Sequence, residues 1–306
     1  MKGSCAIVIP VYTLNLSSIE KAGLLNSVER LSDYDIFFLH KESLDIALFY
    51  QLIKLTPSQV NHCRAISVED CWLESVKSYS KLLFQGWFYQ RFQGWDYMLI
   101  FQQDAWLFGD GRDLAFWINK GYTYIGAPWT SHLGPDTPDM GVGNGGFSLR
   151  HVPSMIRICT SFKTKIVPVF RFRKLAYRMG LFRRYHLFPR SMWPQLFSKR
   201  LIVFFKMSLG WHNTLAYFSE IVGTQEDHLI SLFSPLVFPW MRIPPMAEAA
   251  AFSVETNPRE TCSYYQVSRP FGCHAWEMYD REFWIKAYPE EFRAALGVED
   301  ASTHGS

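Results

Sequence analysis

A carboxylate follows the most apolar segment of the sequence. The run 97–101 ends in Gln102-Gln103-Asp104, and the chain becomes apolar again at 106–108. A carboxylate fixed between two hydrophobic clusters suits a ligand of a metal or of a metal-bound phosphate, although Asp also caps turns. In an open parallel sheet, ligands bind beyond the carboxyl ends of the strands. We therefore predict a metal-binding role for Asp104.

Two further segments carry groups that can move protons or bind metals. Glu226 and Asp227 head an apolar, helix-like run, and either carboxylate is a candidate general base. Thr224 with Asp227 three positions later also fits a helix capping box. His274 follows Gly272-Cys273. A lone histidine is more often structural, but neutral imidazole is also the commonest side-chain metal ligand.

Four glycines fall within the six positions 141–146. Such a segment lets the backbone approach a ligand closely and exposes amide donors, although glycine clusters often only turn the chain. It has no Gly-Lys-Ser/Thr of a Walker loop, and it does not follow the first strand as a dinucleotide-binding G-x-G-x-x-G would. The standard nucleotide-binding folds are therefore not indicated.

The elements that must position these groups alternate along the first 150 residues. Short β-branched or apolar runs predict strands, and apolar residues at helical spacing predict helices. The predicted strands are 6–11, 34–39, 64–68, 97–101, 122–127 and 146–149. The predicted helices are 19–31, 69–92, 227–233 and 280–296. This alternation predicts an α/β fold with a mostly parallel sheet.

Composition is that of a globular chain, with 48% hydrophobic and 19% charged residues among 306. No run of about 20 apolar residues is present, and the first residues do not resemble a secretory signal, so a cytoplasmic location is expected. The six cysteines are too sparse for a disulfide scaffold, and none forms a C-x-x-C pair. We predict one domain over 1–297 and a flexible tail at 298–306.

Charge is distributed unevenly. Residues 140–219 contain 14 Lys or Arg and no acid, and the rest of the chain has 17 basic and 28 acidic residues. We predict that 157–219 is a basic, aromatic, mainly helical insertion. Cations flanking an apolar stripe are typical of a helix on an anionic membrane surface, and a solvated helical face is the alternative. Nucleic acid is disfavoured because no nucleic-acid-binding motif accompanies these residues.

Taken together and in this order, the motifs resemble nucleotide-sugar-dependent glycosyltransferases of the GT-A type, and more closely the bacterial DUF5672 glycosyltransferase-like domain. The strings that carry the resemblance are Val8-Ile9-Pro10-Val11-Tyr12, Tyr79-Ser80-Lys81-Leu82, Leu99-Ile100-Phe101-Gln102-Gln103-Asp104, Tyr124-Ile125-Gly126-Ala127-Pro128-Trp129, Gly143-Asn144-Gly145-Gly146-Phe147-Ser148-Leu149-Arg150, Glu226-Asp227 and Phe271-Gly272-Cys273-His274. They cover roughly residues 5–150 and 220–285, which leaves the basic segment as an insertion. The resemblance implies a GT-A-like (Rossmann-like) fold, with a mostly parallel central sheet flanked by helices.

The resemblance also implies the roles of individual residues. Gln102-Gln103-Asp104 stands in the place of the GT-A Asp-x-Asp motif, with Gln102 replacing the first acid. Asp104 and His274 would bind Mn²⁺ or Mg²⁺ against the donor diphosphate, and a mixed oxygen and nitrogen ligand set favours Mn²⁺. Asp227 would be the base, or Glu226 in its place. The residues expected at the donor or acceptor are Pro10, Tyr12, Lys81, Gln102, Gln103, Trp129, Asn144, Gly145, Gly146, Trp276 and, at a phosphate, Arg150.

The implied activity is transfer of a sugar from a nucleotide-diphosphate sugar to a hydroxyl of a cell-surface glycan, with inversion. If the acceptor is linked to a lipid, the basic insertion would hold the enzyme on the inner face of the cytoplasmic membrane. An inactive GT-A-fold protein that binds sugar nucleotides or glycans is the alternative, because fold does not dictate function. A nucleotidyltransferase is disfavoured, because Tyr12-Thr13-Leu14-Asn15 is not a glycine-rich, basic loop.

Overall fold

A six-stranded sheet forms the centre of the protein. The structure is a computed structural model that describes residues 3–130, 141–160 and 225–296. The strand order is β3-β2-β1-β4-β7-β6. Strands β3, β2, β1 and β4 are parallel, and β7 is antiparallel to both β4 and β6. The strands are β1 (Cys5–Val11), β2 (Asp35–Lys41), β3 (Cys63–Val68), β4 (Tyr97–Phe101), β6 (Tyr124–Ile125) and β7 (Phe147–His151).

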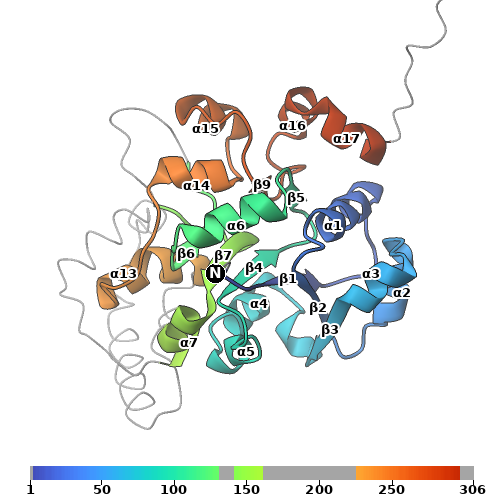
Figure 1. Cartoon of the computed structure of the whole chain (residues 1–306), viewed down its shortest axis with the longest axis horizontal. Helices are drawn as coiled ribbons and strands as arrows, with labels where there is room; N and C mark the ends of the chain where they lie inside the picture. The colour runs from blue at the N-terminus through green and yellow to red at the C-terminus, as the bar shows by residue number, and fades with distance from the viewer. Residues whose placement is uncertain (1–2, 131–140, 161–224, 297–306) are drawn as a thin grey trace, which may run out of the picture.

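Helices cover both faces of this sheet (Figure 1). One face packs on α1 (Ser18–Arg30), α2 (Ile46–Leu52) and α6 (Gly111–Asn119), with α3 (Pro57–His62) before β3. The other packs on α4 (Val76–Leu82), α5 (Gly86–Gln90), α7 (Val152–Thr160) and the π-helical turn Leu229–Phe233, which follows α12 (Glu226–His228) and precedes α13 (Ser234–Val237). Burial on both faces explains why β1 and β4 are apolar throughout.

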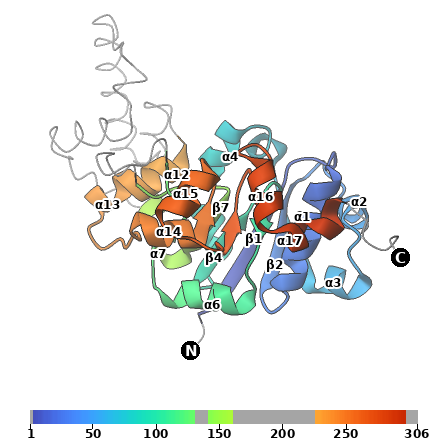
Figure 2. The same ribbon diagram turned by 90° about the horizontal axis from the view of Figure 1, so that it is seen from above.

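A second, three-stranded sheet joins the middle of the chain to its C-terminal part. Its order is β5-β9-β8, with β5 (Trp106–Leu107) antiparallel to β9 (Gly272–Cys273) and β8 (Ser253–Val254) parallel to β9. The helices around it are α14 (Met246–Phe252), α15 (Pro258–Tyr264), α16 (Arg281–Ala287) and α17 (Pro289–Leu296). Figure 2 shows these four helices in front of the central strands.

The predicted α/β class is confirmed, and most predicted strands coincide with observed ones. The segment 97–101 is β4 to the residue, and 6–11 lies within β1. The predicted strand 122–127 is correct only over Tyr124–Ile125. The prediction for 146–149 falls on β7, which begins one residue later and extends to His151.

The single helix predicted over 69–92 is wrong. The segment contains a 3₁₀ turn (Asp70–Trp72) followed by α4 and α5. Ser75 caps the start of α4 by accepting a hydrogen bond from the backbone N–H of Ser78, which breaks the helix before it. Val76, the first residue of α4, is 67% exposed. The apolar spacing looked continuous because the separate pieces bury residues in the same cluster.

The predicted C-terminal helix 280–296 is two helices, α16 and α17, separated at Tyr288 and restarting at Pro289. A proline favours the first position of a new helix and cannot continue an old one without losing a hydrogen bond. Most of the predicted insertion 157–219, and the tail 298–306, lie outside the described residues. Within the described ranges, no helix has the length and apolar character needed to cross a bilayer.

Candidate active site at the carboxyl edge of the central sheet

Segments from distant parts of the sequence meet at one edge of the central sheet. The carboxyl ends of β1 and β4 lie there because these strands are parallel. The amino end of β7 lies there as well, since β7 is antiparallel to β4 and Phe147 pairs with Phe101. The Gln102 N–H extends this pairing by donating to the Gly146 carbonyl at 2.9 Å. The polar residues after β4 and the glycine segment before β7 are therefore neighbours.

Asp104 and His274 lie in contact at this edge. The distance from His274 Nε2 to Asp104 Oδ1 is 3.2 Å, and Gln102 Oε1 is 3.0 Å from the same nitrogen. Asp104 lies between β4 and β5, and His274 directly follows β9, so pairing of β5 with β9 brings the two together. The Asp104 side chain is 49% exposed, whereas that of His274 is 12% exposed. The carboxylate therefore presents an accessible face beside an anchored imidazole.

Glu255 holds the other ring nitrogen of His274 and was not predicted from the sequence. Its Oε1 lies 3.0 Å from His274 Nδ1. Because Val254 pairs with Cys273 in parallel, the next residues, Glu255 and His274, lie side by side. A carboxylate only accepts, so Nδ1 carries the proton. Two-residue strands leave no periodic signal in the sequence, which is why this pairing could not be foreseen.

The acids around His274 set its charge. Although burial favours the neutral ring, the carboxylates of Asp104 and Glu255 raise the pKa of His274 to about 10. Burial would raise the pKa of Asp104, but the facing imidazolium lowers it. In the metal-free chain, these groups therefore form a charged triad of acid, imidazolium and acid.

A divalent cation at this point would have three protein atoms as ligands. Among residues 3–130, 141–160 and 225–296, no three His, Cys, Asp or Glu side chains form a metal-binding group. Asp104 Oδ1, His274 Nε2 and the neutral Gln102 Oε1 would be the protein ligands. Their spacings of 3.0 and 3.2 Å from Nε2 are close to the separation of about 3.0 Å between adjacent ligands of an octahedral ion with bonds of about 2.1 Å. The same distances are those of the hydrogen bond and ion pair that Nε2 makes in the metal-free chain, so a cation at this point is a proposal.

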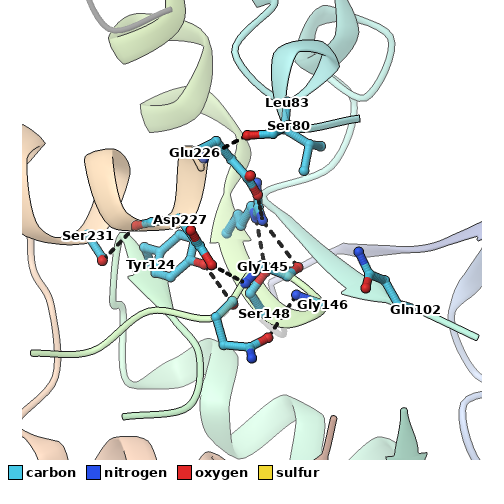
Figure 3. Close-up of polar contacts among 12 residues, drawn as sticks. Ser80, Leu83, Gln102, Tyr124, Gly145, Gly146, Ser148, Glu226, Asp227 and Ser231 are labelled. Atoms are coloured by element: carbon cyan, nitrogen blue, oxygen red, sulfur yellow. Dashed lines mark hydrogen bonds and ion pairs between the residues drawn. The ribbon is translucent and has the colours of Figure 1, made fainter. Parts of the chain in front are cut away.

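A second cluster surrounds Glu226, which makes an ion pair with Arg150 at 3.1 Å (Figure 3). Arg150 is completely buried and also donates to the Tyr89 hydroxyl. The prediction that Arg150 contacts a phosphate is therefore corrected, because its charge is compensated in the interior. Burial and the adjacent Asp227 raise the pKa of Glu226, and its backbone N–H donates to Ser80 Oγ. A carboxylate enclosed in this way is not placed to take a proton from a substrate.

Asp227 is also enclosed. Its Oδ2 accepts the Gly145 N–H at 3.1 Å, and its Oδ1 accepts the backbone N–H and Nδ1 of His228 at 2.7 and 2.9 Å. Although burial disfavours the charged form, the hydrogen bonds from His228 lower the pKa of Asp227. With both oxygens engaged and the residue 6% exposed, Asp227 does not face a substrate as the predicted base would. Thr224, its predicted capping partner, lies outside the described residues.

The glycine segment separates these two clusters. The Gly145 N–H is held by Asp227, while a Cβ built on Gly146 would fall 2.0 Å from His274 Nε2. Asn144 has a positive φ of 64°, and its Oδ1 accepts the Gly146 N–H at 2.8 Å. Asn144 therefore holds the turn, and the two glycines allow the close approach of Glu226 to Gly145 and of His274 to Gly146.

The end of β1 lies against Gln103 and α4. Pro10 is buried within β1, and the Tyr12 N–H donates to Gln103 Oε1 at 3.4 Å. Tyr12 packs edge-on against Tyr79 of α4, the helix that also carries the partly buried Lys81. Within the described part of the chain, the buried Gln103 Nε2 has no hydrogen-bond partner.

The two predicted sugar-stacking tryptophans differ. Trp276 is 3% exposed and packs between Trp106 and Phe292, so the prediction of a stacking role for it is corrected. Trp129 is partly exposed and stacks on the His228 ring at a centroid distance of 4.2 Å. His228 itself was not predicted as a functional residue.

The fold and these clusters define an α/β protein with clusters of polar side chains at the carboxyl edge of its sheet. The chain belongs to the family described as "Protein of unknown function (DUF5672)", whose model matches residues 62–274. This confirms the resemblance to that family. A search of curated proteins found no match.

Solved structures similar to the chain include mouse xyloside xylosyltransferase 1, with 10% identity, 89% of this chain and 97% of that chain covered, and a TM-score of 0.44. The mannosyltransferase Ktr4p of S. cerevisiae, solved with GDP, has 12% identity, 42% and 40% coverage, and a TM-score of 0.30. An active-site mutant of LgtC has 14% identity, 50% and 59% coverage, and a TM-score of 0.37. The chain thus spans less than half of the mannosyltransferase. Because each of these TM-scores is below 0.5, no conclusion about activity follows.

Proposed function

We propose that this chain is a metal-dependent glycosyltransferase of the GT-A type, which moves a sugar from a nucleotide-diphosphate sugar to a hydroxyl of a glycan acceptor. The observation that carries the proposal is the contact between Asp104 and His274, with Gln102 beside them, at the carboxyl edge of the sheet. This is the edge at which open α/β sheets bind ligands. A half-exposed acid, an anchored imidazole and a closely approaching glycine backbone suit a diphosphate bound through a cation.

Asp104, His274 and Gln102 would hold Mn²⁺ or Mg²⁺. The imidazole nitrogen in this set favours Mn²⁺, because Mg²⁺ prefers oxygen ligands. When bound, the cation would stabilise, as a Lewis acid, the negative charge that develops on the leaving diphosphate. Glu255 supports this assignment, since histidines that bind metals commonly donate their other N–H to a carboxylate.

The donor would lie between the end of β1 and the glycine segment. Tyr12, Gln103 and Asn144 belong to this region, and Gln103 Nε2, which has no partner among the described residues, would supply a hydrogen-bond donor for an oxygen atom of a nucleotide sugar. Pro10, Lys81, Gly145 and Gly146 stay part of the proposed donor or acceptor site. A lipid-linked glycan acceptor, and a membrane-surface role for the basic segment, also stay proposals.

The test is thermal unfolding of the whole chain with a panel of nucleoside diphosphates and their sugars, with and without Mn²⁺. A ligand that binds the folded state raises the apparent stability by about 2.7 kcal/mol at a hundred times its Kd. We expect stabilisation that needs both Mn²⁺ and a diphosphate, followed by measurable release of the nucleoside diphosphate from the matching sugar donor. No stabilisation by any member of the panel would reject the proposal.

A sugar-nucleotide-binding protein without catalysis is the second candidate. It is favoured by the neutral Gln102 in place of an acid and by the enclosure of Glu226 and Asp227. The two candidates differ in one observable. Both predict binding that depends on Mn²⁺, but only the enzyme releases the sugar from a bound donor.

A further inference from the structure

The enclosure of Asp227 leaves the reaction without the base that the sequence indicated, and the side chain next to it can take that place. We propose that His228 is the general base that accepts the proton of the attacking hydroxyl, and that Asp227 is its positioning residue. This inference rests on the proposed glycosyltransferase function and adds a catalytic residue to it.

The hydrogen bond between the two residues fixes which nitrogen is available. Asp227 Oδ1 lies 2.9 Å from His228 Nδ1, and a carboxylate can only accept. In the neutral ring, Nδ1 therefore carries the hydrogen and Nε2 carries the lone pair. A third of the His228 side chain is exposed, compared with 8% of the Asp227 side chain. The Asp227 carboxylate therefore orients the imidazole ring, and His228 Nε2 is the nitrogen that can accept a proton, as in other acid–histidine pairs.

Contacts on two sides place this ring beside the glycine segment. Trp129 stacks on the imidazole with an angle of 15° between the rings, and the indole also covers Gly143, where a Cβ would fall 1.8 Å from it. Asp227 joins the same segment through the Gly145 N–H. The next glycine, Gly146, packs against His274 Nε2. The base and the proposed cation ligand are therefore both held against the glycine segment, His228 through Trp129 and Asp227, and His274 at Gly146.

The charges that face His228 favour proton uptake. They are the carboxylates of Asp227 and Glu226 on its own helix and of Glu255 from the segment after β8. Although burial alone lowers it, Asp227 and then these more distant acids raise the pKa of His228. A general base works best with a pKa near the operating pH.

The proposed step moves a proton to His228 and a sugar to the acceptor. The acceptor O–H gives its proton to His228 Nε2, and the oxygen forms a bond to C1 of the donor sugar. The bond between C1 and the phosphate oxygen breaks, and its electron pair leaves with the nucleoside diphosphate. The products are the glycoside, the nucleoside diphosphate and an imidazolium held by Asp227. Attack opposite the leaving group inverts the configuration at C1.

Turnover provides the first test. The probe is the nucleotide-diphosphate sugar identified by thermal unfolding, with water as the acceptor, and the variants are His228→Gln and His228→Ala. A positioned base contributes typically 10²–10⁴-fold, so we expect kcat to fall by about 100-fold or more while binding of the nucleoside diphosphate with Mn²⁺ is unchanged. Added imidazole should restore part of the His228→Ala rate, and the rise of kcat/KM with pH should disappear in both variants.

The exposed His62, at the amino end of β3 and thus on the opposite edge of the sheet, provides the matched control His62→Ala. Turnover of the His228 variants within threefold of wild type would overturn the assignment of the base while leaving the proposed function intact. If the wild-type chain neither binds a nucleoside diphosphate nor turns over a donor, the proposed function fails and this inference fails with it.

A second measurement does not depend on activity. ¹⁵N NMR of the histidine-labelled full chain, assigned by His228→Gln, reports which ring nitrogen carries the hydrogen at a pH where the ring is neutral. We expect the Nδ1–H form in wild type and a loss of that preference in Asp227→Asn. An Nε2–H form in the wild-type chain would overturn the proposal, because Nε2 then has no lone pair to accept a proton.

Discussion

His274 Nε2 lies 3.2 Å from Asp104 Oδ1, although Asp104 follows a strand of the central sheet and His274 follows a strand of the smaller one. If this pair binds the cation, Asp104→Asn and His274→Ala should each abolish stabilisation by nucleoside diphosphate with Mn²⁺ and reduce turnover to background. The measurement is thermal unfolding with both ligands. The exposed Asp33, in the loop before β2, gives the control Asp33→Asn. Variants that retain Mn²⁺-dependent stabilisation would place the cation elsewhere.

The Glu255→Gln variant tests whether the Glu255 carboxylate stabilises His274 through Nδ1, the ring nitrogen that does not contact Asp104. The amide cannot supply the charge that holds Nδ1–H, so we expect Mn²⁺ affinity to fall by about 10–100-fold. Electron paramagnetic resonance of free Mn²⁺ measures this directly. Glu260→Gln, at an exposed position of α15, is the control and should bind Mn²⁺ as wild type does. Equal affinities in the two variants would show that Glu255 does not support the ligand.

Gly146→Ala tests the close approach of the backbone. The new methyl group would lie 2.0 Å from His274 Nε2, so the imidazole must move away from Asp104. We expect Mn²⁺ binding to weaken by at least about tenfold, the range seen when support around metal ligands is lost. Gly94→Ala meets no atom within 4 Å and should leave metal binding unchanged. A Gly146→Ala chain with wild-type affinity would argue against His274 as a ligand.

The buried ion pair of Arg150 and Glu226 predicts a non-additive loss of stability. Arg150→Met leaves an unpaired carboxylate in the interior, which costs about 3–5 kcal/mol of unfolding free energy. Adding Glu226→Gln to that variant removes the stranded charge, so we expect the double variant to be more stable than Arg150→Met alone. Denaturant unfolding of wild type, both single variants and the double variant gives the interaction free energy between Arg150 and Glu226. Additive losses would contradict a direct pair.

The Asp227 and His228 pair predicts how stability varies with pH. The raised pKa of His228 adds to the free energy of unfolding. This contribution is complete below the pKa of about 6.5 that the ring has in the unfolded chain, and it is lost as the pH rises through the pKa of the folded chain. The lowered pKa of Asp227 also adds to the free energy of unfolding. This contribution is present above the unfolded-chain pKa of about 3.8 and is lost as the pH falls through the pKa of the folded chain.

The difference in unfolding free energy between wild type and His228→Gln should therefore be larger at about pH 6 than at about pH 9. Denaturant unfolding at the two pH values measures it. An equal difference at both would mean that the ring carries no charge at the lower pH.

The sequence was most informative where burial is continuous. Strand β4 was predicted to the residue because a strand covered on both faces is apolar throughout, and Asp104 stands out directly after it. The contact of Asp104 with His274 is the one that the family resemblance implies, although the two-residue strand before His274 was not predicted.

Other parts of the site carry no such signal. Glu255 reaches His274 through strands of two residues, which are too short to show alternation. The resemblance implies that Arg150 lies at a phosphate and that Glu226 is an alternative base, whereas in the structure each compensates the charge of the other in the interior. The role proposed for His228 has no signal in the sequence, because it depends on the enclosure of Asp227, which only the folded chain shows.

The Asp104 and His274 side chains bridge the two strand systems beside the site. A cation bound by both side chains would link the two sheets. Local opening of 253–274 would then become rarer when the ion is present, because opening would require its release. Slower amide hydrogen exchange in β8 and β9 when Mn²⁺ is added would show that the ion links the sheets.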